Sequence, residues 1–189
     1  DRVAAYMPNT IETVEAFIAT TSLGGIWSSC SPDFGSKGVI ERFSQINPKV
    51  LFITDQYFYN GKKIDILNRL PEILKLIPSI KSVVISNYPG KKFIKNKYKF
   101  KKINLFKWNE LMQTNAEKID FKRFDFETEL AILYSSGTTG KPKCICHRSG
   151  GVLIQHMKEH QLHCNIKEND NVFYFTTCGW MMWNWLVSS

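Results

Sequence analysis

The sequence lacks the features of a membrane protein and of a secreted, disulfide-rich protein. Charged or polar residues interrupt every apolar stretch in its 189 residues, so no run reaches the roughly 20 residues that a membrane-spanning helix needs. No basic, apolar and small-residue leader stands at the start, and we therefore expect a cytoplasmic protein. The cysteines number five, an odd count at irregular positions, which favours reduced thiols over a disulfide framework.

Acidic residues are absent from one stretch, residues 89–102, which contains seven lysines and accounts for most of the formal net charge of +8. The rest of the chain holds 18 basic and 17 acidic residues. Such a tract could bind a polyanion, with Phe93, Tyr98 and Phe100 available for stacking. We favour a solvated, lysine-rich connection between two strands over a nucleic-acid-binding module.

Short apolar runs alternate with helical patterns along the sequence. Strands are expected at Val3–Met7, Ile26–Cys30, Val50–Thr54, Val83–Ser86, Leu130–Tyr134, Lys143–His147 and Val172–Thr176. Helices are expected from a Thr10 cap to Gly24-Gly25, through Val39–Ile46, over Ile64–Ile77 with a break near Pro71, around Trp108–Met112, and over Val152–His163. This alternation predicts an α/β fold with a mainly parallel sheet flanked by helices on both faces.

One segment between two expected strands combines small residues, hydroxyl groups and cations. Residues 134–143 read Tyr-Ser-Ser-Gly-Thr-Thr-Gly-Lys-Pro-Lys. A triphosphate requires free backbone N–H groups, small side chains that let the backbone approach, hydroxyl donors and positive charge. The residues that would supply these are Ser135, Ser136, Gly137, Thr138, Thr139, Gly140, Lys141 and Lys143. We therefore predict that this segment binds phosphate groups.

The segment differs from a P-loop of the Walker type. Only two residues separate its glycines, and Pro142 follows Lys141 where that motif has Ser or Thr at the start of a helix. Proline lacks an N–H and disfavours helical backbone in the preceding residue. The pattern therefore predicts a strand–loop–strand phosphate loop, with a Ser/Thr/Gly-rich hairpin that binds no ligand as the alternative.

At these residues the sequence resembles the adenylate-forming superfamily, which includes acyl-CoA synthetases, luciferases and peptide-synthetase adenylation domains. The resemblance covers essentially the whole chain, most loosely in the lysine tract, and is closest to ligases that activate acetoacetate. Segments that carry it are Ser31–Gly35, Cys144–His147, Gly150-Gly151, Gln155–His160 and Gly179–Trp185. It implies that residues 1–189 are an incomplete N-terminal domain. The C-terminal domain with the adenylation lysine would be absent, so no catalytic residue is expected in this chain.

The resemblance also implies a two-step reaction. A short carboxylic acid attacks the α-phosphorus of ATP to give an acyl-AMP and pyrophosphate, and the thiol of CoA then displaces AMP. Acetoacetate is the favoured acid, with acetate and propionate as alternatives. Ser135–Gly140 and Lys143 would hold the β- and γ-phosphates of ATP, and Mg²⁺ would screen the remaining charge.

Two further sites follow from the resemblance alone. In relatives, the residues after the Gly-Trp pair line the acyl pocket, which here implies Trp180, Met181, Met182 and Trp183. Methionine and tryptophan at this spacing are equally typical of a packed core. Lys62 would lie near a phosphate of CoA, although a solvated lysine is the simpler interpretation.

Two other motifs carry metal or thiol chemistry in other proteins. The segment from His156 to His160 matches the zinc-peptidase pattern H-x-x-E-H on an expected helix, but no third protein ligand is evident. We interpret it as a half-exposed helix face and assign no metal site. Cys144 and Cys146 are too closely spaced for a zinc knuckle, and no acid orients a dyad of Cys146 with His147. The expected partners are small molecules, with neither nucleic acid nor a membrane.

Overall fold

The computed structural model describes residues 1–92, 99–113, 118–135 and 140–189. Within them, one large sheet is built from β1 (Arg2–Tyr6), β2 (Ile26–Cys30), β3 (Val50–Thr54), β6 (Ser82–Ser86), β7 (Asn104–Lys107), β8 (Glu129–Tyr134) and β9 (Cys144–Arg148). The strand order is β7-β6-β3-β1-β2-β8-β9. All neighbours run parallel except β9, the edge strand, which is antiparallel to β8. The predicted mainly parallel sheet is confirmed.

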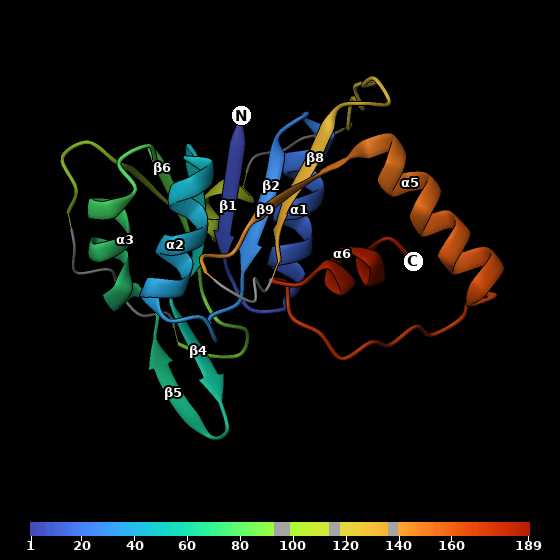
Figure 1. The fold of residues 1–189 in the computed structure, drawn as a ribbon. Helices are drawn as coiled ribbons and strands as arrows, with labels where there is room; N and C mark the ends of the chain where they lie inside the picture. Colours follow the sequence, from blue (N-terminus) through green and yellow to red (C-terminus); the bar gives the residue numbers. More distant parts are fainter. Residues whose placement is uncertain (93–98, 114–117, 136–139) are drawn as a thin grey trace.

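Helices cover both faces of this sheet (Figure 1). α1 (Ile11–Ser22) packs on one face, where Ala16 joins a cluster around the fully buried Trp27. α2 (Ser36–Ile46) and α3 (Leu70–Leu76) cover the opposite face, and Phe43 and Ile73 are fully buried there. The apolar periodicity of each helix therefore sets which side of the helix faces the sheet.

The remaining helical elements are short or belong to the C-terminal region. They are the 3₁₀ turn η1 (Leu67–Arg69), α4 (Trp108–Leu111), α5 (Ser149–Lys158), the π-helical turn η2 (Glu159–His163) and α6 (Met181–Val187). α4 confirms the short helical piece expected around Trp108. In the part of the chain that the structure describes, no helix has the length and apolar character needed to cross a bilayer.

The ends of α1 lie where the sequence predicts, although its start is held differently. Thr10 is extended and its carbonyl accepts the first helical hydrogen bonds, but its side chain makes no capping bond. The hydroxyl of Thr13 instead donates to the carbonyl of Pro8 at 2.6 Å. Gly24 ends the helix at a φ of +74°, a conformation that glycine adopts without steric cost.

The helix expected over Ile64–Ile77 is only partly correct. Its first two residues, Ile64 and Asp65, belong instead to β5 (Lys62–Asp65), which forms a hairpin with β4 (Gln56–Tyr59) through Asn60 and Gly61 at positive φ. An Asn-Gly pair between short β segments is a recognised signal for such a turn, and the prediction overlooked it. Pro71 does not break a helix, because it lies in the first turn of α3, where its missing N–H costs nothing.

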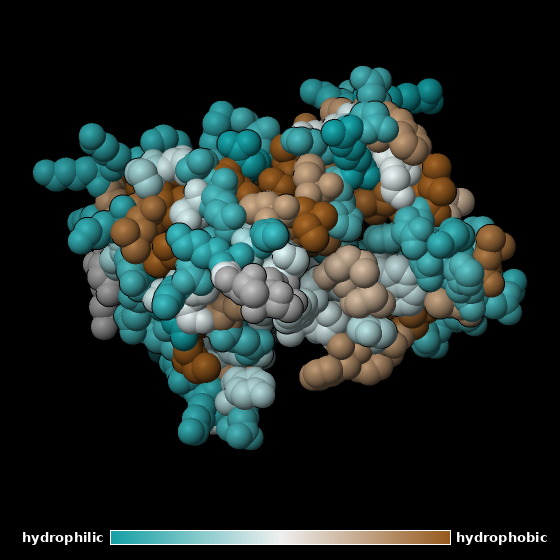
Figure 2. Space-filling model, viewed as in Figure 1, coloured by the Kyte–Doolittle hydropathy of each residue, from teal (hydrophilic) through white to brown (hydrophobic). Residues whose placement is uncertain are grey.

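The strand expected at Val172–Thr176 is wrong. The structure has no strand there, and Phe173 and Phe175 are 83% and 88% exposed. Apolar residues reach the surface over this C-terminal region (Figure 2). Alternation in a sequence favours extended backbone, but a strand also requires a hydrogen-bonded neighbour, which the described residues do not supply here.

β7, which the sequence pattern did not predict, lies beside β6 and has only two apolar residues, Leu105 and Phe106. The lysine tract therefore connects two neighbouring strands, as predicted, with residues 93–98 outside the described part of the chain.

Candidate functional site

The segment predicted to bind phosphate joins two antiparallel strands. Tyr134 at the end of β8 faces Cys144 at the start of β9, and the N–H of Ser135 donates to the carbonyl of Lys143 at 3.0 Å. Ser135 is half-buried, whereas Gly140 and Lys143 are exposed. The strand–loop–strand arrangement is therefore confirmed. The other predicted phosphate-binding residues, Ser136, Gly137, Thr138 and Thr139, lie outside the described residues.

The turn Ser31–Gly35 after β2 lies at the same edge of the sheet, because the carboxyl ends of parallel strands meet there. The hydroxyl of Tyr6 donates to the carbonyl of Phe34 at 2.5 Å. The guanidinium of Arg69 donates to that carbonyl at 3.0 Å, to the carbonyl of Pro32 at 3.2 Å and to the Tyr6 hydroxyl. Burial raises the pKa of Tyr6 to about 12 although Arg69 opposes this, so the hydroxyl keeps its proton and fixes the turn.

The segment that precedes α6 is attached to the same strand ends. The buried thiol of Cys178 donates to the carbonyl of Met7 at 2.9 Å, and the Ser29 hydroxyl donates to the carbonyl of Cys178 at 2.5 Å. Burial raises the pKa of Cys178 to about 12. Gly179 then packs directly on the ring of Phe34. These contacts bring residues 178–180 beside the ends of β1 and β2, to which no local sequence pattern connects them.

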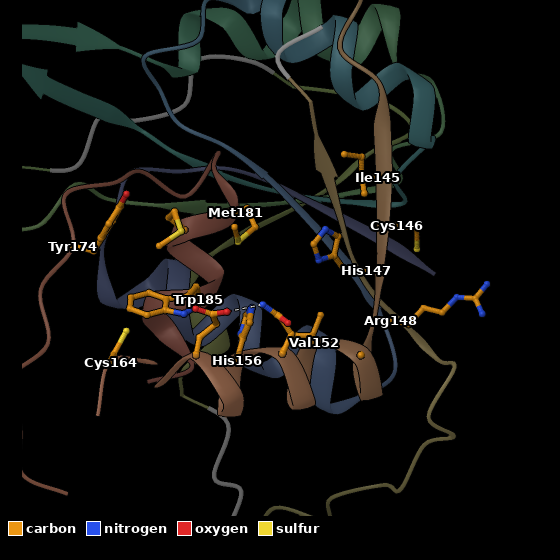
Figure 3. Close-up of a pocket in the computed structure, with 14 residues that line it drawn as sticks. Ile145, Cys146, His147, Arg148, Val152, His156, Cys164, Tyr174, Met181 and Trp185 are labelled. Carbon is orange, nitrogen blue, oxygen red and sulfur yellow. Dashed lines mark hydrogen bonds between the residues drawn. The ribbon is translucent and has the colours of Figure 1, made fainter. Parts of the chain in front are cut away.

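A cavity of about 820 Å³ lies between β9, α5 and α6 (Figure 3). Its lining includes Ile145 and His147 from β9, Val152 and His156 from α5, and Met181, Met182 and Trp185 from α6. His147, His156 and Met181 point toward one another. The walls are largely apolar, which fits a small organic ligand better than an ion.

The structure divides the four residues predicted for the acyl pocket. Met181 and Met182 line the cavity. Trp183 does not, because it is fully buried in the core, donates from Nε1 to Oδ1 of Asn9 at 2.8 Å and meets the ring of Phe17 edge-on at 5.7 Å. Trp180 is 48% exposed and also lies outside the cavity lining. The core interpretation is therefore correct for Trp183.

The histidines of the H-x-x-E-H segment hold α6 against α5. Nδ1 of His156 lies 2.7 Å from the Ser188 hydroxyl, and Nε2 of His160 lies 3.0 Å from the Trp185 carbonyl. Because a carbonyl only accepts, Nε2 of His160 carries a proton and donates. Among the described residues, no group of three or more histidine, cysteine, aspartate or glutamate side chains is arranged to hold a metal ion.

The two histidines of the cavity are shifted toward their neutral forms. Burial lowers the pKa of His147. Burial also lowers the pKa of His156, and the nearby His160 and His147 lower it further. Cys146 lies on the opposite face of β9 from His147, since side chains alternate along a strand, so the two do not form a dyad.

Lys62, the predicted contact for CoA, begins β5 directly after the hairpin turn and is exposed. Figure 1 shows this hairpin projecting from the body of the molecule. This exposed position would allow Lys62 to contact a large ligand. Among the described residues, no contact links Lys62 to the loop between β8 and β9.

Arg42 is a residue of the site that no sequence motif indicated. Its guanidinium carbon lies 4.3 Å from the centre of the Phe34 ring and 5.7 Å from that of Tyr134. It thereby joins the Ser31–Gly35 turn to the strand that enters the phosphate loop. Arg42 lies one turn before the buried Ile46 and is half-buried, so the helical pattern places it beside the buried face of α2 but cannot identify these partners.

One mainly parallel sheet carries both the loop that is predicted to bind phosphate and the apolar cavity. Residues 1–187 match the family model of the AMP-binding enzymes, and the chain belongs to that family. It is similar along its whole length to the acetoacetyl-CoA synthetase of Gallus gallus (46% identical over 193 residues) and that of Rhizobium meliloti strain 1021 (47% over 188 residues). Among solved structures, acetoacetyl-CoA synthetase from Streptomyces lividans matches the whole chain with a TM-score of 0.88 and 39% identity.

The chain spans only part of these proteins. It covers 29% of the Gallus gallus protein, 28% of the Rhizobium meliloti protein and 28% of the Streptomyces lividans chain. The predicted adenylate-forming fold and family are therefore confirmed over the residues present.

Proposed function

We propose that the chain is part of an ATP-dependent ligase that activates acetoacetate as an acyl-AMP and transfers it to CoA. The similarity to acetoacetyl-CoA synthetases over the whole chain supports this activity. The observation that carries it is structural. The loop that begins at Ser135 leaves the carboxyl end of β8, and the segment 178–182 is attached to the carboxyl ends of the neighbouring strands β1 and β2. A phosphate-binding loop and an acid-binding segment at one edge would allow a carboxylate to meet the α-phosphorus of ATP.

In this proposal, Ser135–Gly140 and Lys143 hold the β- and γ-phosphates. The reaction joins two anions and builds charge on the leaving pyrophosphate, so backbone N–H groups and the ammonium of Lys143 would stabilise the transition state. Mg²⁺ is part of the proposal as the counter-ion of ATP. Ser135 is half-buried, and a hydroxyl is the kind of hard oxygen ligand that Mg²⁺ prefers.

The acid would bind beside Met181 and Met182, whose bulky apolar side chains narrow the cavity and so favour a short acid. CoA would approach from the side of the β4–β5 hairpin, where Lys62 could meet one of its phosphates.

In this proposal, residues 1–189 belong to a large N-terminal domain. The small C-terminal domain with the adenylation lysine would lie elsewhere in the enzyme. The five free cysteines support a reducing compartment such as the cytoplasm.

The test is ATP–pyrophosphate exchange by the full-length gene product with acetoacetate, acetate and propionate. Acetoacetate should support the fastest exchange. Lys143→Ala should reduce exchange about 100-fold, because it removes a positive charge from the developing phosphate charge. Lys81→Ala is the matched control, since Lys81 is an exposed lysine just before β6 at the opposite, amino edge of the sheet.

Three results would separate the parts of this proposal. Exchange with acetate or propionate alone would change the assigned acid but keep the reaction. Full exchange in Lys143→Ala would remove the phosphate role of the loop. No exchange with any acid would contradict the ligase activity itself.

A further inference from the structure

We propose that Gln45 is a positioning residue for the phosphate loop, holding the leg that carries Lys143. The inference rests on the proposed function, since it deepens the role of the same loop. It arises from a side chain that the mechanism above does not use, on a helix remote in sequence from the loop.

The amide of Gln45 bridges α2 and the start of β9. Nε2 donates to the carbonyl of Pro142 at 2.9 Å and to the carbonyl of Glu41, one turn earlier in α2, at 2.8 Å. Oε1 accepts from the thiol of Cys144 at 3.6 Å. Both donor hydrogens and the acceptor of the amide are therefore engaged. Two of the three contacts reach residues on either side of Lys143.

These contacts lie at the end of the described β8–β9 pairing. Among the described residues, the last bond between the two legs runs from the N–H of Ser135 to the carbonyl of Lys143. Pro142, the next residue toward the loop, has no N–H to donate. Its ring is buried, and its carbonyl is instead held from the side by α2. Gln45 thus continues the support of the exit leg by one residue beyond the β8–β9 pairing.

The same helix also contacts the entry leg. Arg42 lies one turn before Gln45 and faces the ring of Tyr134, the residue that precedes Ser135. α2 is itself fixed, because Val39, Phe43 and Ile46 are buried in the core. A rigid helix therefore contacts both ends of the loop. Among the described residues, Gln45 is the only one whose side chain forms a hydrogen bond to Pro142.

The expected consequence is specific to ATP. Gln45 is exposed, so water can replace its hydrogen bonds and the fold should tolerate their loss. The orientation of Lys143 toward the phosphates would nevertheless relax, and small displacements of a positioning group reduce rates strongly.

The test compares wild type with Gln45→Met in the full-length gene product. Methionine has a similar length and no hydrogen-bonding amide. In ATP–pyrophosphate exchange, the KM for ATP should rise about tenfold, in keeping with the loss of two hydrogen bonds. The KM for acetoacetate should stay within about twofold of wild type, and the urea midpoint of unfolding should stay within error of it. Gln113→Met, the same change at an exposed residue after α4, should leave all these values unchanged.

The possible outcomes distinguish the positioning role of Gln45 from the proposed ligase activity. An unchanged KM for ATP in an active Gln45→Met enzyme would overturn the positioning role and leave the ligase assignment intact. Equal increases in the KM for ATP and for acetoacetate, or a lower urea midpoint, would show a general structural role and also overturn it. A wild-type enzyme that exchanges with no acid would overturn the proposed function, and the role of Gln45 with it.

Discussion

Gly179 offers a direct test of how closely residues 178–180 pack on the carboxyl edge of the sheet. A Cβ on this residue would lie 2.9 Å from Cε2 of Phe34, 3.4 Å from the backbone nitrogen of Ser31 and 3.7 Å from Cα of Cys30. The φ of Gly179 lies outside the left-handed region, so alanine meets no backbone strain there. The cost of Gly179→Ala should therefore be purely steric.

The size of that cost follows from the distances. Carbon atoms pack best at about 3.5–4.0 Å, so the Phe34 ring must retreat by roughly 0.6–1.1 Å. The ring is restrained, because Arg42 lies 4.3 Å from its centre and the carbonyl of Phe34 accepts from Tyr6 and Arg69. Overpacking of a restrained contact typically costs about 1–3 kcal/mol. We expect Gly179→Ala to lower the free energy of unfolding by this amount.

Urea unfolding would measure this loss of free energy of unfolding in four proteins: wild type, Gly179→Ala, Phe34→Leu and the double variant. Leucine removes the ring edge that the new methyl group meets, so the double variant should lose about 0.5–3 kcal/mol less than the sum of the single losses. Gly151→Ala is the control, because a Cβ there has no atom within 4 Å and alanine favours α5 by up to about 1 kcal/mol. Wild-type stability in Gly179→Ala, or strictly additive losses, would refute the packing argument.

Two other predictions concern the cavity. Met182→Gly should raise the rate of ATP–pyrophosphate exchange with a six-carbon acid, relative to the rate with acetoacetate, by about 10-fold, because it opens an apolar wall of the cavity. An unchanged ratio of the two rates would exclude Met182 from the acid site. The lowered pKa values of His147 and His156 mean that the unfolded chain takes up protons first as the pH falls below about 6.5. The free energy of unfolding should therefore drop as the pH falls from about 7.5 to the lowered pKa values, and less in a His147→Asn, His156→Asn variant; equal losses in both proteins would contradict this.

The phosphate loop shows how far a local pattern can lead. Pro142 has no N–H and cannot continue a helix from Lys141, and Lys143–His147 alternates, so the order of residues alone predicts the strand that follows the loop. The alternating strands and helices likewise predicted the parallel sheet and both of its covered faces. Such features depend on backbone conformations that adjacent residues determine among themselves.

Other features required long-range contacts. The hydrogen bond from Cys178 to Met7 joins residues 171 positions apart, and the bond from Gln45 to Pro142 joins residues 97 apart. The pattern that marks Met181, Met182 and Trp183 as apolar is the same for all three, yet two line a cavity and one is buried against Phe17. Val172–Thr176 has the pattern of a strand but, among the described residues, no neighbour to pair with.

The difference between the features that the sequence predicted and those that it did not has one physical cause. Local sequence determines where the chain is helical or extended and which side chains are apolar, because those preferences arise within a few residues. Only the tertiary structure decides which strand ends meet at one edge, which apolar side chains face a cavity, and which helix lies beside the phosphate loop, because those outcomes depend on the packing of elements brought together from across the chain.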